Sequence, residues 1–234
     1  ITGLSQVITS GTNYFLVVDV DPSVNGSTTA VQPSLGGGNV TITTGGGAAT
    51  GTATGTSYSF VPLLTVANLS TGLAGSPLTA GSSNQGVFGF SLTSSGTQTV
   101  SVINVQLSST PSSKWSNYRL ITSTDASYAT AGDNSAPIGG LTFTPSASQV
   151  AITGLSQVIT SGTNYFLVVD VDPTVTGATT AVQPSLVAAN ITASSGGVAG
   201  TASGTSYSFV SATATFAQLS TGIASSPLFA GTTN

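Results

Sequence analysis

The stretch TNYFLVVDVD, residues 163–172, decides the fold. Residues 165–169 are apolar at every position, so an extended strand here would bury both of its faces. Beyond them one face continues with Val171, the other carries Asp170 and Asp172, and Pro173 then ends the strand. The pattern predicts the central strand of a β-sheet.

Simpler strand patterns recur along the chain. Phe88, Phe90 and Leu92 alternate with small or polar residues, which is the period of a strand with one buried face. Clusters of Ser, Gly, Thr, Asp and Asn, such as 94–97 and 131–134, separate these segments as turns. No stretch has the period of an amphipathic helix. We therefore expect an all-β fold in which antiparallel sheets pack as a sandwich.

A long internal repeat is the strongest signal in the sequence. Residues 1–35 recur at 152–186 with three substitutions, and the hexapeptide GTSYSF occurs at both 55–60 and 204–209. The first pair of copies lies 151 residues apart, which is the size of a whole domain and not of a solenoid coil.

The repeat predicts three parts of the chain. Residues 1–64 are expected to be the C-terminal part of one β-sandwich repeat, residues 65–213 a complete repeat, and residues 214–234 the first strand of a following repeat. The segments between them are short, so neighbouring domains should abut as a stiff rod. We also expect the chain to be one segment of a longer polypeptide.

Composition excludes most kinds of site chemistry. The chain has no Cys, His or Met, and its charged residues are Lys114, Arg119 and 6 Asp, which gives a net charge of −4. Imidazole- or thiol-based catalysis and zinc, copper, haem or iron–sulfur sites are therefore excluded. Two cations argue against nucleic-acid binding, and apolar runs are too short for a membrane span. We predict no enzymatic activity.

The runs 154–172 and 86–91 resemble the immunoglobulin-like tandem repeats of very large cell-surface proteins in Bacteroidetes-type bacteria. This resemblance implies an Ig-like β-sandwich, an extracellular location at the cell surface, export by the type IX secretion route, and a role as an adhesin or filament. It is carried by composition and fold, so it names no binding residue.

Two pairs of aspartates are candidates for a calcium site. Asp170 and Asp172, and their copies Asp19 and Asp21, stand two positions apart at a strand end, so each pair points to one side. Calcium binds six to eight oxygen ligands, which such carboxylates could begin to supply. The alternative is that solvent-facing Asp ends the strand and discourages edge pairing. Apart from calcium we predict no cofactor.

A second candidate is a ligand-binding patch of Trp115, Tyr118 and Arg119. An aromatic face beside a planar guanidinium suits stacking and hydrogen bonding to a sugar. Alternatively, Trp115 covers one end of the sandwich. Flat threonine arrays, such as those at 41–43, could instead bind an ice surface.

The sequence therefore predicts a structural or adhesive segment of a long extracellular bacterial surface fibre. Its low charge leaves little repulsion to oppose association with itself or with neighbouring repeats. The alternative is a carbohydrate- or ice-binding repeat module. Nucleic-acid partners and a membrane span are not expected.

Overall fold

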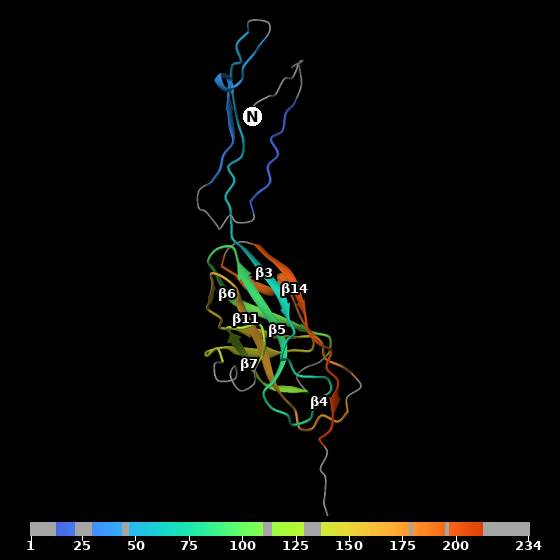
Figure 1. Cartoon of the computed structure of the whole chain (residues 1–234). Helices are drawn as coiled ribbons and strands as arrows, with labels where there is room; N and C mark the ends of the chain where they lie inside the picture. Colours follow the sequence, from blue (N-terminus) through green and yellow to red (C-terminus); the bar gives the residue numbers. More distant parts are fainter. Residues whose placement is uncertain are drawn as a thin grey trace, which may run out of the picture.

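The computed structural model of the chain combines a β-sandwich, from Leu63 to Val210, with an N-terminal segment that extends from one end of it (Figure 1). The residues described are 13–21, 30–43, 47–109, 114–128, 137–177, 180–194 and 197–212. The predicted following repeat, 214–234, lies outside them. Among these residues no helix is long and apolar enough to cross a membrane.

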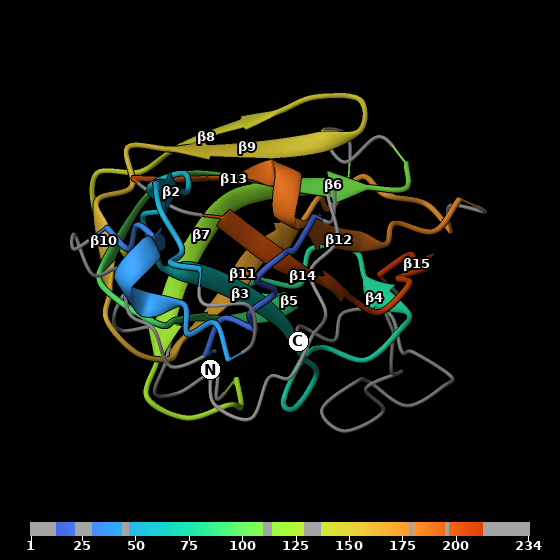
Figure 2. The same cartoon turned by 90° about the horizontal axis from the view of Figure 1, so that it is seen from above.

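The sandwich has two layers, as expected for an all-β protein, and one continuous sheet folds over to form both. The first layer has the order β7 (Trp115–Ser123), β11 (Thr163–Val171), β5 (Gln85–Ser94), β3 (Leu63–Leu69) and β14 (Gly197–Ser203). The second continues from β14 with β12 (Pro184–Val187), β6 (Gln98–Leu107), β9 (Gln149–Thr153) and β8 (Thr142–Pro145). In the second layer β10 (Gln157–Ile159) and β13 (Ile191–Ala193) also pair with β6. Figure 2 shows β8 and β9 on one side of the sandwich.

The predicted central strand is confirmed. β11 lies between β5 and β7 and pairs antiparallel with both, so that Tyr165 is opposite Phe90 on one side and Thr122 on the other. Every side chain from Tyr165 to Val169 is fully buried. The rings of Phe90 and Tyr165 stack with their centroids 5.3 Å apart.

Burial on both faces of β11 divides the core into two clusters. Tyr165, Leu167 and Val169 pack between the layers with most of the buried apolar residues. Phe166 and Val168 point to the other face, where they pack with Ile121 and Tyr128.

Most strand pairs are antiparallel, as predicted, but two pairs are parallel. β14 pairs parallel with β3, from Gly197 opposite Leu63 to Gly200 opposite Val66, and β15 (Phe209–Val210) pairs parallel with β4 (Leu78–Thr79). Beyond Gly200, β14 pairs with β12 instead, so this strand passes from one layer to the other. The alternation pattern could not show this because it is the same for both strand directions.

Gly200 is the residue at which β14 changes layers, and its backbone requires glycine. Its φ is +87°, and a Cβ added there would collide with the carbonyl oxygen of Val66. The strand therefore approaches β3 more closely than a side chain would allow.

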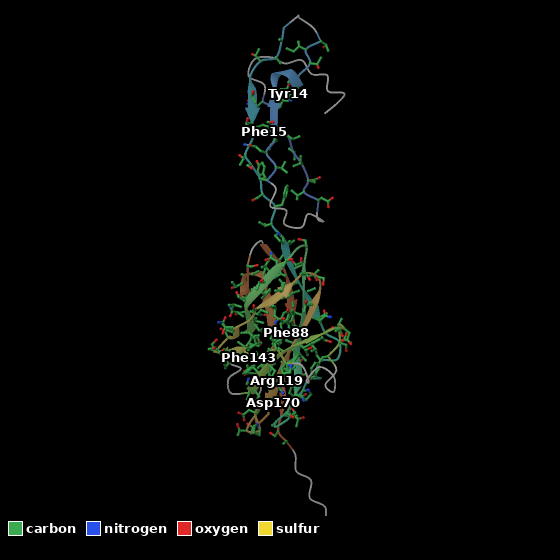
Figure 3. All side chains as sticks on the ribbon, turned by 90° about the vertical axis from the view of Figure 1, so that its left-hand side faces the viewer. Tyr14, Phe15, Phe88, Arg119, Phe143 and Asp170 are labelled. Carbon is green, nitrogen blue, oxygen red and sulfur yellow. The ribbon has the colours of Figure 1, made fainter. Side chains whose placement is uncertain are left out.

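The N-terminal segment has local structure but does not reach the sandwich core. β1 (Ser34–Gly36) and β2 (Thr52–Thr54) form a two-stranded antiparallel sheet, and the short 3-10 turn η1 (Gly37–Asn39) follows β1. An equivalent turn, η2 (Ala188–Asn190), follows β12. Figure 3 shows Tyr14 and Phe15 in this segment, far from Phe88 and Phe143 of the sandwich.

Candidate functional site

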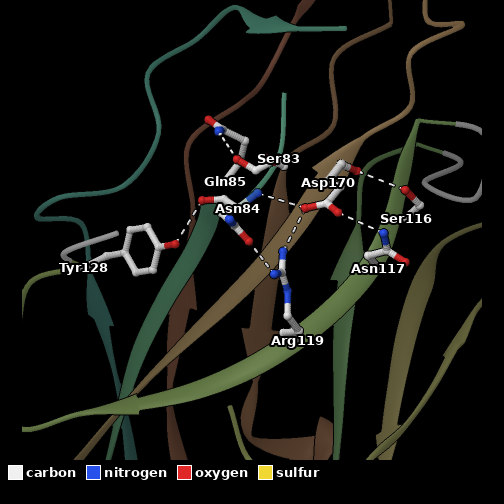
Figure 4. Close-up of polar contacts among 8 residues, drawn as sticks. All are labelled: Ser83, Asn84, Gln85, Ser116, Asn117, Arg119, Tyr128 and Asp170. Carbon is white, nitrogen blue, oxygen red and sulfur yellow. Dashed lines mark hydrogen bonds and ion pairs between the residues drawn. The ribbon is translucent and has the colours of Figure 1, made fainter. Parts of the chain in front are cut away.

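The main polar cluster of the sandwich surrounds Asp170, near the end of β11 (Figure 4). Its Oδ1 accepts hydrogen bonds from the backbone N–H of Asn84 and from Nη2 of Arg119, both at 2.8 Å. Its Oδ2 accepts one from Nδ2 of Asn117 at 2.9 Å. Three elements therefore converge on one carboxylate: β7, β11 and the turn before β5.

Local backbone features place these partners. Asn84 and Asn117 both have positive φ, 56° and 47°, a conformation that Asn tolerates better than most residues. The β11–β7 pairing has a register shift between Val168 and Asp170. Such an irregularity re-aims side chains at a strand end, here toward Arg119.

The cluster extends through Asn84 to a fifth residue, Tyr128, on a neighbouring loop. Arg119 also donates from Nη1 to Oδ1 of Asn84, and the hydroxyl of Tyr128 donates to the Asn84 carbonyl at 2.9 Å. Asn84 thus links the strand ends to the loop that holds Tyr128. Together these contacts join β7, β11, the turn before β5 and the loop of Tyr128 at one end of the first layer.

The protonation of Asp170 follows from these contacts. Burial alone would raise the pKa of its carboxyl, but hydrogen bonds from Asn84 and Asn117 and the charge of Arg119 outweigh that effect. The pKa of Asp170 consequently lies below its ordinary value. At neutral pH the carboxylate is charged and paired.

Asp170 and Asp172 do not act together in the structure. The carboxylate of Asp172 accepts hydrogen bonds from the backbone N–H and the hydroxyl of Thr174, at 2.7 and 2.6 Å, and these contacts lower its pKa. Such local bonding is typical of a turn. The two carboxylates therefore have separate protein partners.

This donor set does not fit a calcium ion. Calcium would have to displace the donors around Asp170 and would lie beside the guanidinium of Arg119. The described residues contain no group of three acidic side chains close enough to hold a metal. Asp19 and Asp21 lie on the exposed N-terminal segment. Calcium binding at these four aspartates stays a prediction without a structural counterpart.

The predicted sugar patch is likewise not assembled. Trp115 is only 2% exposed and packs edge-on against Tyr207, 6.3 Å between ring centroids. Tyr118 stacks on Phe143 at 6.2 Å, and burial raises the pKa of Tyr118 to about 12. Arg119 pairs with Asp170. The three side chains offer no common exposed face, so the patch too stays a prediction.

Sequence reasoning missed Asn84 and Asn117, the partners that complete the Asp170 cluster. The available signal was that Arg119 is one of two cations in the chain and would need an acidic partner if partly buried. Nothing in the sequence pattern pointed to Asn84, which lies 86 positions from Asp170.

A shallow polar hollow of about 480 Å³ lies between the turn after β7 and the start of β11. Its lining is uncharged and rich in hydroxyl and amide groups: residues 122–124, Gln157 and residues 162–164. Such groups can bind sugars or water but provide no acid, base or nucleophile pair.

No protein-family model and no curated protein sequence matches this chain.

Proposed function

We propose that the chain is a load-bearing segment of an extracellular structural or adhesive fibre, with no catalytic role. The parallel pairing of β3 with β14 carries this proposal. Because these two strands run in the same direction, the chain joins the sandwich at Leu63 and leaves it at Val210, at opposite ends (Figure 1). A domain with this geometry can be joined in series.

The same pairing lies on the path of a pulling force. Tension between the two ends would pull β3 and β14 in opposite directions along their length. All backbone hydrogen bonds between Leu63–Val66 and Gly197–Gly200 would then resist together, in shear. A pair of strands peeled from one end would instead lose its bonds one at a time.

A buried side chain holds the chain at the point where a pulling force would first act on the sandwich. Gln98 is fully buried and donates from Nε2 to the carbonyl of Pro62 at 3.0 Å, directly before β3. The N–H of Leu63 donates to the hydroxyl of Ser95 at 3.0 Å. These contacts hold the chain where it joins the sandwich.

Single-molecule pulling tests the proposal. The chain has no cysteine, so introduced pairs give unique attachment points. Pro62→Cys with Ser211→Cys pulls the sandwich end to end, whereas Pro62→Cys with Gly197→Cys peels β14 from β3 at one end. We expect a clearly higher unfolding force for the first pair. Equal forces, or a lower one end to end, would count against a load-bearing role.

A carbohydrate-binding module is the second candidate, and the polar hollow beside β11 favours it. Titration of the whole chain with a panel of oligosaccharides tests it. Saturable binding that Asn164→Ala and Gln157→Ala abolish would support this module. Absence of binding across the panel would leave the fibre as the better reading.

A further inference from the structure

One short stretch of the internal repeat differs between its two copies at almost every position. Residues 36–43 (GGGNVTIT) and 187–194 (VAANITAS) differ at six of eight positions, although the copies before them differ at only three of 35. The two positions that stay the same are Asn39, equivalent to Asn190, and Thr41, equivalent to Thr192. Both copies therefore retain the pattern Asn-X-Thr, which is the acceptor sequon for N-linked glycosylation.

Two other sequons in the chain show the opposite behaviour. The match at 25–27 (NGS) becomes TGA at 176–178, and the match at 68–70 (NLS) becomes QLS at 218–220. Both patterns are lost although the residues around them are mostly the same in the two copies. Loss of this kind is expected of chance matches in a chain rich in Ser and Thr. Chance does not explain a pattern that stays while its surroundings change.

The retained sequon has the same backbone in both copies. Its Asn is the last residue of η1 or η2, and the residue that follows is extended, with φ −116° and ψ 117° at Val40 and φ −119° and ψ 128° at Ile191. Ile191 points into the main core and is only 7% exposed. Asn190 is half-buried and Thr192 is exposed, so both side chains reach the surface on either side of a buried residue.

The fold gives no reason to retain these two side chains. Within the part of the chain that the structure describes, neither the Asn190 amide nor the Thr192 hydroxyl forms a hydrogen bond. The local bonds come from the backbone instead: the N–H of Ile191 donates to the carbonyl of Ala188, and β13 pairs with β6. A partner outside the chain that recognises Asn and Thr would explain why both are kept.

The surroundings of Asn190 leave room for an attached group. Figure 2 shows η2 as a short orange coil beside β6, and it also contacts β14. None of the residues of η2 is buried. A group attached to Nδ2 of Asn190 would therefore displace no buried side chain.

We propose that Asn190, and Asn39 in the other copy, are attachment sites for an N-linked glycan. The inference rests on the extracellular location in the proposed function, because the transferase acts on exported chains. Nδ2 forms a bond to C1 of the first sugar, and the bond from C1 to the diphosphate of a lipid-linked oligosaccharide breaks. The amide loses one proton, and the lipid diphosphate leaves with the electron pair. The hydroxyl of Thr192 is recognised but not consumed.

Such a glycan would suit a fibre with few charges. The net charge of the chain is only −4, so electrostatic repulsion does little to keep neighbouring fibres apart. A hydrated glycan at the same place in each copy would supply that separation.

Peptide mass spectrometry of the protein isolated from the cells that export it tests the proposal. Digestion needs a protease that cuts at aromatic residues, because Lys114 and Arg119 are the only sites for trypsin. We expect the peptide that contains Asn190 to carry a carbohydrate mass. Asn190→Gln and the isosteric Thr192→Val should both remove it, whereas Thr192→Ser should retain it. A peptide found only in its bare form, or a glycan that survives Thr192→Val, would overturn the proposal.

The chain produced without export, and hence without glycan, provides a second measurement. In this chain Asn190→Gln and Thr192→Val should leave the melting temperature unchanged, because neither side chain is hydrogen-bonded. A clear drop would show that the fold itself requires these residues and would contradict the inference. The pulling experiment uses the same unmodified chain, so a failure of the load-bearing role and a failure of the glycan site are distinguishable.

Discussion

Arg119 on β7 lies 2.8 Å from Asp170 on β11, between Nη2 and Oδ1, and this ion pair closes one end of the first layer. The two side chains are 30% and 23% exposed. An ion pair at this depth is partly screened by water, so its effect comes mainly from the hydrogen bonds gathered around it.

The Asp170 cluster should make stability depend on pH in the acid range. The pKa of Asp170 is lowered in the folded chain, so the stabilisation is complete above the ordinary pKa of an unfolded aspartate. It is lost as the pH falls through the lower, folded value. We expect the melting temperature to fall below about pH 4. In Asp170→Asn this fall should be smaller; an unchanged pH profile would show that other carboxylates cause it.

At neutral pH, Asp170→Asn should destabilise the sandwich by about 1–2 kcal/mol. The new amide places a donor against Asn117 or Arg119, both of which also donate. Urea denaturation measures the change. Asp125→Asn is a matched control, because within the described residues the contacts of the Asp125 carboxylate are local ones, from the Ser123 hydroxyl and the backbone N–H of Ser127. Equal losses in both variants would contradict a special role for the cluster.

Removing calcium should leave the chain unchanged. The donors around Asp170 and Asp172 already occupy these carboxylates, so we expect a chelator to withdraw no ion from them. Thermal melting in excess chelator and in millimolar calcium should coincide. A melting temperature that rises with calcium, by mass action on the folded state, would instead support the predicted calcium site.

Gly200→Ala should destabilise the sandwich by about 2 kcal/mol or more, because the positive φ and the nearby Val66 carbonyl leave no room for a methyl group. Gly197→Ala, in the same strand, meets only ordinary contact with Leu63 and should change stability by about 0.5 kcal/mol at most. Urea midpoints compare the two. Similar values would mean that the switch between layers tolerates a side chain.

Trp115 is the chain's one tryptophan, and its burial predicts blue-shifted emission that acrylamide quenches poorly. Added oligosaccharides should not alter this emission, since the indole offers no exposed face. Trp115→Ala should cost about 3–5 kcal/mol. Efficient quenching in the folded chain, or a sugar-dependent shift, would restore the predicted patch.

The sequence by itself determined the strand character of the chain, the central position of 165–169 and the exclusion of thiol and imidazole chemistry. These follow from properties of single residues and their spacing, since a run that is apolar at every position needs cover on both faces. The internal repeat could also be recognised from the sequence, because it requires only a comparison of residues within the chain.

Only the tertiary structure decided which residues meet. Asp170 finds Arg119 51 positions away and Asn84 86 positions away, and no local pattern encodes such distances. The sequence also did not predict that β14 runs parallel to β3. The clearest case is the repeat itself: 14–18 and 165–169 have the same sequence, but only the second copy is buried. Burial depends on the strands that lie alongside, and β5 and β7 can cover only one copy at a time.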